Sequence, residues 1–148
     1  MGVKVLDSWA LIAFFQDEPA AKAVEELLVA AEEGSHRLLL SVVNWGEVYY
    51  DTMRSVSQEA AEVVAREMAG YRIEVVGVDG KDLQLARQAA IYKATRRMSY
   101  ADAFAAALAR TRDAELVTGE RCQEFPARRV PELDRHVLAA HRQRLAVR

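Results

Sequence analysis

The chain has 148 residues, 51% of them hydrophobic and 28% charged, which predicts one globular domain over residues 1–148 and excludes a disordered or fibrous protein. No apolar stretch is long enough to span a membrane, no signal-peptide pattern opens the chain, and the single cysteine, Cys122, excludes an internal disulfide or a cysteine-based zinc site, so we expect a cytoplasmic protein. The net charge of −2 hides an asymmetry: residues 1–74 have 6 Lys and Arg against 13 Asp and Glu, residues 75–148 have 14 against 9, and this arginine-rich half suits either nucleic-acid binding or an ordinary solvated surface.

Short apolar runs alternate with longer segments in which apolar residues recur at helical spacing. This alternation predicts an α/β fold with a mainly parallel central sheet covered by helices on both faces. The expected strands are 3–6, 38–40, 73–78, 115–118 and a short fifth at 129–130. The expected helices are 8–15, 19–33, 44–53, 57–69, 79–95, 99–112 and one beginning at 134.

Residues that favour helix ends set several of these boundaries. Pro19 suits the first position of the second helix, and Gly34 suits the position just after its end. Side chains that cap helix starts precede most of the other helices. These expected caps are Asn44, Ser57, Asp79, Ser99 and Asp134.

Four acidic residues lie where a strand ends or a helix begins: Asp7, Glu47, Asp102 and Glu120. Ligand sites of parallel sheets lie beyond the carboxyl ends of the strands, so we expect these carboxylates to share one pocket. Gathered negative charges repel one another unless a cation offsets them. Carboxylate oxygens suit Mg²⁺ or Mn²⁺, which can activate a water molecule for hydrolysis of a phosphodiester.

Each acid also has a structural interpretation. Glu47 with Asn44, and Asp102 with Ser99, have the spacing of capping boxes, and Asp7 can cap the helix that follows it. Apolar neighbours of Glu47 and Asp102 favour partial burial, and a partly buried acid needs a partner. Glu120 could instead be solvated, and Asp51, one turn beyond Glu47, is expected to be solvated or to support the site.

Other common catalytic patterns are missing from the sequence. It contains no glycine-rich phosphate loop, no Ser-His-Asp arrangement and no H-E-x-x-H pattern, which argues against a P-loop enzyme or a zinc protease. The three histidines have no ligand spacing. They are His36, His136 and His141.

The order of the motifs resembles the PIN domain family. A strand ending in Asp7-Ser8 is followed by Asn44-x-x-Glu47-Val48, then by the segment S-Y-A-D-A-F-A-A-A-L-A that contains Asp102, then by Thr118-Gly119 and an acid. The resemblance covers nearly the whole chain, and the short length is similar to that of VapC-type toxins from toxin-antitoxin pairs. Glu120 departs from the pattern, because the family usually has aspartate there.

The resemblance implies a three-layer α/β/α sandwich and a metal-dependent endoribonuclease. Asp7, Glu47 and Asp102 match the acidic triad of the family, and Glu120 would assist at the same Mg²⁺ or Mn²⁺ ion. Ser8 and Thr118 match small hydroxyl positions that would support the acids. The implied partners are an RNA substrate, a VapB-like antitoxin and a second copy of the chain in a homodimer.

Two other functions remain open on the sequence. One is a catalytically weakened RNA- or antitoxin-binding module of the same fold, which the change at Glu120 would fit. The other is a DNA nuclease of the same broad fold, although the chain has no obvious long insertion for gripping a duplex.

Overall fold

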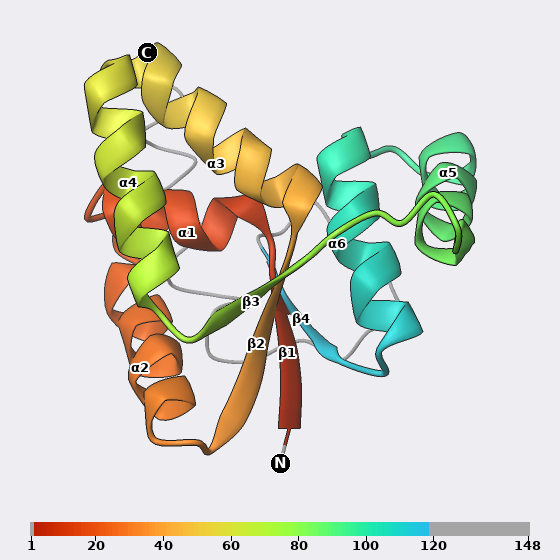
Figure 1. The fold of residues 1–148 in the computed structure, drawn as a ribbon, viewed down its shortest axis with the longest axis horizontal. Coiled ribbons are helices and arrows are strands. Elements are labelled where there is room, and N and C mark those ends of the chain that lie inside the picture. Colours follow the sequence, from red (N-terminus) through yellow and green to blue (C-terminus); the bar gives the residue numbers. More distant parts are fainter. Residues whose placement is uncertain (1, 119–148) are drawn as a thin grey trace.

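Four parallel strands form the centre of the structure, a computed structural model that describes residues 2–118 (Figure 1). The strands lie in the order β3-β2-β1-β4, and helices cover both faces of the sheet, which confirms the expected sandwich. The strands are β1 Gly2–Leu6, β2 His36–Ser41, β3 Ile73–Val76 and β4 Glu115–Val117. The helices are α1 Ser8–Phe15, α2 Ala21–Glu32, α3 Val42–Ser55, α4 Gln58–Gly70, α5 Gln84–Thr95 and α6 Tyr100–Thr111. The strand expected at 129–130, the helix expected from Asp134 and residue Glu120 lie outside the described residues.

Alternating side chains of the strands point into two separate hydrophobic cores. Leu6 and its neighbour Val117 face the helices α1 to α4, whereas Val5 and its neighbour Leu116 face α5 and α6. The two groups of helices lie on opposite sides of the sheet in Figure 1. Both faces of the sheet are therefore covered at its centre, which explains apolar runs such as Leu38-Leu39-Leu40 in β2.

The first strand is central, and this places the switch in strand order beside it. β1 pairs with β2 on one side and with β4 on the other, both in parallel. The chain thus leaves β1 and β4 at neighbouring points of the same edge. A crevice between diverging connections at such a switch point is the usual position of a ligand site in this class of fold.

Three of the expected helix boundaries are confirmed. Ser57 and Ser99 cap α4 and α6 through their side chains, each accepting from a backbone N–H group of the first turn. Gly34 follows the end of α2 with a φ of +80°, a left-handed conformation that glycine adopts at no steric cost.

Two other boundaries were predicted wrongly. Helix α2 begins at Ala21, so Pro19 precedes the helix instead of occupying its first position. Asp79 does not cap α5, which begins only at Gln84; its carboxylate accepts from the N–H of Lys81 at 2.8 Å and forms a local turn.

Helix α3 also begins earlier than expected. Ser41 is its cap, accepting from the N–H of Val43 at 3.2 Å, and the helix starts at Val42. Asn44 is therefore the third helical residue, and Glu47 lies beyond the first turn. The predicted capping box between Asn44 and Glu47 does not form.

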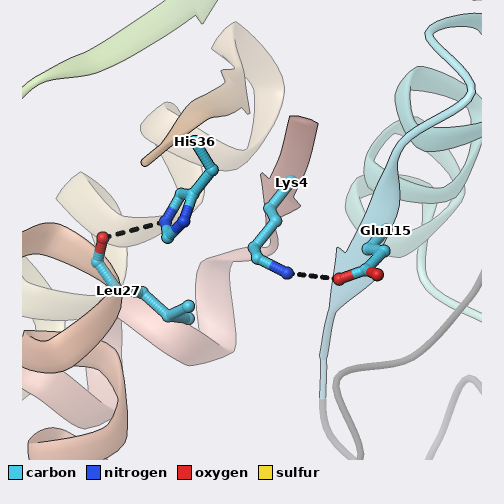
Figure 2. A network of polar contacts seen from close by, with 4 residues as sticks. All are labelled: Lys4, Leu27, His36 and Glu115. Atoms are coloured by element: carbon cyan, nitrogen blue, oxygen red, sulfur yellow. Dashed lines mark hydrogen bonds and ion pairs between the residues drawn. The ribbon is translucent and has the colours of Figure 1, made fainter. Parts of the chain in front are cut away.

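Two polar contacts fix the sheet, one between neighbouring strands and one between the sheet and helix α2 (Figure 2). Lys4 forms a partly buried ion pair with Glu115, its directly opposed residue on β4. His36, the first residue of β2, donates from Nε2 to the carbonyl oxygen of Leu27 in α2 at 3.1 Å, which requires the tautomer protonated on Nε2. These side chains all have partners within the fold, so we assign them a structural role.

None of the helices within residues 2–118 is both long and apolar enough to cross a membrane.

Candidate functional site

Asp7 lies between strand β1 and helix α1, directly after the strand and directly before the helix. Its side chain accepts a hydrogen bond from the N–H of Ala10 at 3.0 Å and thereby caps α1. Its own N–H donates to the carbonyl oxygen of Val117 at 3.2 Å, which extends the pairing of β1 with β4 by one residue. Only 2% of Asp7 is exposed. A carboxylate is thus fixed, inside the protein, at the switch in strand order.

The surroundings of Asp7 disfavour its negative charge. Burial raises the pKa of Asp7 from its ordinary value of 3.8 to about 7, and the charges of Asp102 and Glu47 add to the rise. Hydrogen bonds from the side chain of Thr118 and the backbone of Ala10 lower the pKa, but they do not offset the burial. A carboxylate with a pKa near neutrality at a sheet edge is typical of a functional site. The same result shows that the three acids lie near enough to interact electrostatically.

Thr118 and Ser8 flank Asp7 with hydroxyl groups. Thr118, directly after β4, donates from Oγ1 to Oδ2 of Asp7. Ser8 is buried and follows Asp7 in the sequence. With Ala10 bonded to Oδ1, both oxygens of the Asp7 carboxylate therefore have a protein donor.

Glu47 approaches the site from helix α3 and is partly exposed. The hydroxyl of Tyr50 donates to Oε1 of Glu47 across 3.4 Å. Glu47 does not bond a backbone N–H group of its helix start, since α3 begins five residues earlier. The interpretation of Glu47 as part of a capping box is therefore wrong. Helix capping does not explain why Glu47 lies near Asp7.

Asp102, by contrast, does form its capping box. Its N–H donates to Oγ of Ser99 at 3.0 Å, and its Oδ2 accepts from the N–H of Ser99 at 3.4 Å. The residue is partly exposed, and its charge still reaches Asp7. The capping interpretation is confirmed, and it leaves Oδ1 of Asp102 without a bond to the helix start.

Asn44 connects the segments that carry these acids. It is completely buried, and its Nδ2 donates to Oγ of Ser8 at 2.9 Å and to the carbonyl oxygen of Ala101 at 3.1 Å. The Ser8 hydroxyl in turn lies 3.4 Å from the carbonyl oxygen of Asn44. No donor within residues 2–118 reaches Oδ1 of Asn44. The expectation that Asn44 caps a helix missed this role; the signal available was Ser41, a better cap at the end of β2.

Asp51 lies one turn beyond Glu47 and is partly exposed. It accepts a hydrogen bond from Nε2 of Gln16 at 3.3 Å, which links the middle of α3 to the end of α1. Glu47 and, more weakly, Asp51 raise the pKa of Tyr50, after the larger effect of burial. Asp51 therefore belongs to the polar surroundings of Glu47.

The donor set fits a divalent cation in its chemistry. All three described acids offer hard carboxylate oxygens, and one of them is buried where a positive charge would relieve the cost of its ionisation. Within residues 2–118, no three acidic, histidine or cysteine side chains lie close enough together to hold an ion as they stand. Glu120, the fourth predicted ligand, lies outside the described residues.

The turn before Asp102 is basic and aromatic. The guanidinium of Arg96 lies 5.7 Å from the ring centre of Tyr92. Arg97 is exposed, and no acidic side chain of residues 2–118 forms an ion pair with it. Tyr100 is 48% exposed, and its ring packs edge to face on Phe104 at 4.9 Å. An exposed arginine such as Arg97 suits a contact with a phosphate, and an exposed aromatic ring such as that of Tyr100 suits stacking on a base.

Comparisons with solved structures find the same fold in toxin-antitoxin proteins. The VapBC2 complex of Rickettsia felis, bound to a DNA fragment from its promoter, contains a chain that is 15% identical, with a TM-score of 0.64 over 86% of this chain and 96% of that one. DNA-bound VapBC of Salmonella typhimurium gives 19% identity and a TM-score of 0.62 over 87% and 96%. Mycobacterium tuberculosis VapC20, a toxin that cleaves the sarcin-ricin loop, gives 18% and 0.58 over 77% and 85%. At these identities the likeness concerns the fold.

A search of curated proteins finds no match. The family-level comparison, however, is decisive, because the PIN domain profile matches residues 4–140, which is most of the chain. The match begins within β1 and spans the three other strands and all six helices described above. The chain therefore belongs to the PIN domain family.

Proposed function

We propose that this protein is a metal-dependent endoribonuclease that acts as the VapC-type toxin of a toxin-antitoxin pair. The observation that carries the proposal is the buried carboxylate of Asp7 at the switch in strand order, with the charges of Glu47 and Asp102 acting on it. A cluster of this kind has no evident use in stabilising the fold, since burial and repulsion both disfavour the ionised form of Asp7. It suits an ion that binds an anionic substrate.

In this proposal Asp7, Glu47 and Asp102 bind Mg²⁺ or Mn²⁺, and Glu120 assists. When bound, the ion supplies positive charge for the phosphodiester and lowers the pKa of a water molecule. Asp7 is the fixed member, since both of its oxygens have protein donors. Asp102 offers Oδ1 because its Oδ2 faces the backbone of Ser99.

The hydroxyl groups beside Asp7 have a supporting role in the proposal. Thr118 donates to Oδ2 of Asp7 and thereby stabilises the ionised form that an ion needs. Ser8 holds the first turn of α1 against α3 through Asn44. Neither hydroxyl needs to contact the substrate to affect catalysis, because groups that orient a ligand residue change metal affinity through it.

Single-stranded or looped RNA is the proposed substrate. The exposed guanidinium of Arg97 and the exposed ring of Tyr100 precede Asp102 on the chain, where they would contact a phosphate and a base of a strand entering the site. The antitoxin and homodimer partners are proposed by analogy with the VapBC complexes of similar fold.

The test is cleavage of labelled RNA by the purified protein with Mg²⁺ or Mn²⁺, with EDTA, and with the variants Asp7→Asn and Asp102→Asn. We expect cleavage that requires the ion and that falls by at least about a hundredfold in each variant, since each change removes a charged ligand. Glu26→Gln, an exposed change on α2, is the matched control. Undiminished cleavage by both aspartate variants would refute the assignment. Salt-sensitive RNA binding without cleavage would favour a non-catalytic binding module, and cleavage of flapped DNA in preference to RNA would favour a DNA nuclease.

A further inference from the structure

We infer that Asn44 is a positioning residue, which sets the distance between the acid-bearing segments by tying helices α1 and α6 to helix α3. Its two amide hydrogens are both used, one for Oγ of Ser8 and one for the carbonyl oxygen of Ala101. Ser8 is the residue after Asp7, and Ala101 is the residue before Asp102. Asn44 itself lies three residues before Glu47, on the same helix.

The geometry fixes which end of the amide makes these contacts. The carbonyl oxygen of Ala101 can only accept a hydrogen bond, so the atom that faces it must be the nitrogen of Asn44. Ser8 can accept from that nitrogen while its own hydroxyl points to the backbone carbonyl of Asn44. The amide thus acts as a two-way donor between elements that are otherwise separated by 36 and 57 residues of chain.

Stability alone does not account for an asparagine at this place. The residue is fully buried, and its Oδ1 has no donor within residues 2–118. A buried acceptor without a donor costs about 1–3 kcal/mol, which offsets what the two amide hydrogen bonds contribute. Leucine has the same branched skeleton without polar atoms, although its side chain is larger. What leucine cannot do is hold the starts of α1 and α6 at hydrogen-bond distance from α3. The helix starts next to Asp7 and Asp102 would then lose the hydrogen bonds that hold both of them to the same residue of α3.

Amide hydrogen exchange tests this inference without any metal or substrate. The variant is Asn44→Leu, and the control is Thr52→Val, which removes a buried hydroxyl from the same helix, where it bonds only the carbonyl oxygen of Val48. In Asn44→Leu we expect the amides of Ala10 and Asp102 to exchange more than tenfold faster than in the parent protein. In Thr52→Val both rates should stay unchanged. Unchanged exchange at both amides of Asn44→Leu overturns the inference.

A second variant covers the case in which Asn44→Leu does not fold. Ser8→Ala removes the acceptor on α1 and leaves the bond from Asn44 to Ala101 in place. The amide of Ala10 should then lose protection, whereas that of Asp102 should keep it. Equal loss at both amides, or at neither, would contradict a two-armed link.

The consequence of the Asn44 contacts for metal binding rests on the proposed function. If the acids hold an ion, Asn44→Leu should weaken Mn²⁺ binding, followed by electron paramagnetic resonance, by about ten- to a hundredfold, the range found for groups that orient metal ligands. Thr52→Val should bind Mn²⁺ as the parent does. Absence of Mn²⁺ binding by the parent would refute the proposed function and leave the exchange result to decide the positioning role. Equal Mn²⁺ affinity in parent and Asn44→Leu would refute the positioning role alone.

Discussion

Replacing Asp7 with asparagine should stabilise the metal-free protein, and the gain should grow as the pH rises. The pKa of Asp7 is about 7 in the folded protein, whereas an unfolded chain would have a value near 3.8. Between these values the folded state retains a proton that the unfolded state has released. Stability therefore falls as the pH rises from about 4 and levels off above about 7, which is the opposite of a salt-bridged aspartate.

The size of the effect follows from the shift. A difference of about three pKa units corresponds to ~4 kcal/mol at pH 8, and only ~1–2 kcal/mol of this is already lost at pH 5. Asparagine has no charge to titrate and keeps the shape of the side chain. Its oxygen can still accept from Ala10, and its amide can donate to the hydroxyl of Thr118, which accepts as well as donates. The gap between Asp7→Asn and the parent should thus widen by ~2–3 kcal/mol between pH 5 and pH 8.

The assay is urea denaturation in EDTA at pH 5, 6, 7 and 8, with the free energy of unfolding compared between the two proteins at each pH. The comparison removes the contribution of every other titrating group. Glu26→Gln, which removes an exposed charge from α2, should follow the parent at all four values. A constant difference between Asp7→Asn and the parent across this range would show that burial does not raise the pKa of Asp7. That result would also refute the argument that a bound ion relieves the buried charge.

Three further predictions concern the same region. Mn²⁺ at millimolar concentration should raise the melting temperature of the parent more at pH 8 than at pH 5, and should leave Asp7→Asn unchanged; calorimetry checks this, and an equal rise in both proteins would count against Asp7 as a ligand. Ser99→Ala should lower the free energy of unfolding, measured by urea denaturation, by about 1 kcal/mol through the lost cap, yet retain RNA cleavage. Asp102→Asn should keep the helix and lose cleavage, and the reverse pattern would make Asp102 purely structural. Arg97→Ala should weaken RNA binding and lower the slope of log affinity against log salt concentration by about 1, as filter binding can measure, and an unchanged slope would remove this residue from the phosphate contacts.

The sequence predicts the layers of this fold well because its central strands, β1 and β2, are largely buried. Short runs such as Leu38-Leu39-Leu40 favour buried strands when helical patterns flank them, and the position of Asp7 directly after a strand follows from the same pattern. Local cap signals are less reliable, since several polar residues compete for one helix start. At α3 the serine that ends β2 takes the cap, and at α5 the carboxylate of Asp79 forms a turn of its own.

The sequence predicts the candidate site as a set of acids but not as an arrangement. Spacing alone could not separate Glu47, whose expected cap does not form, from Asp102, whose cap does. The burial of Asp7 and the contacts of Asn44 arise from pairing between segments far apart in the chain, which no local pattern contains. The roles of the four acids remain predictions, and Glu120 lies outside the described residues.

The central position of β1 affects when the surroundings of Asp7 are completed during synthesis. Asp7 leaves the ribosome 111 residues before its hydroxyl partner Thr118, and β1 gains its second neighbour only with β4. A nascent or truncated chain that ends before β4 lacks both the strand that pairs with the end of β1 and the hydroxyl group that donates to Asp7. If the protein acts as the proposed toxin, the surroundings of Asp7 are complete only after almost the entire described fold has been translated.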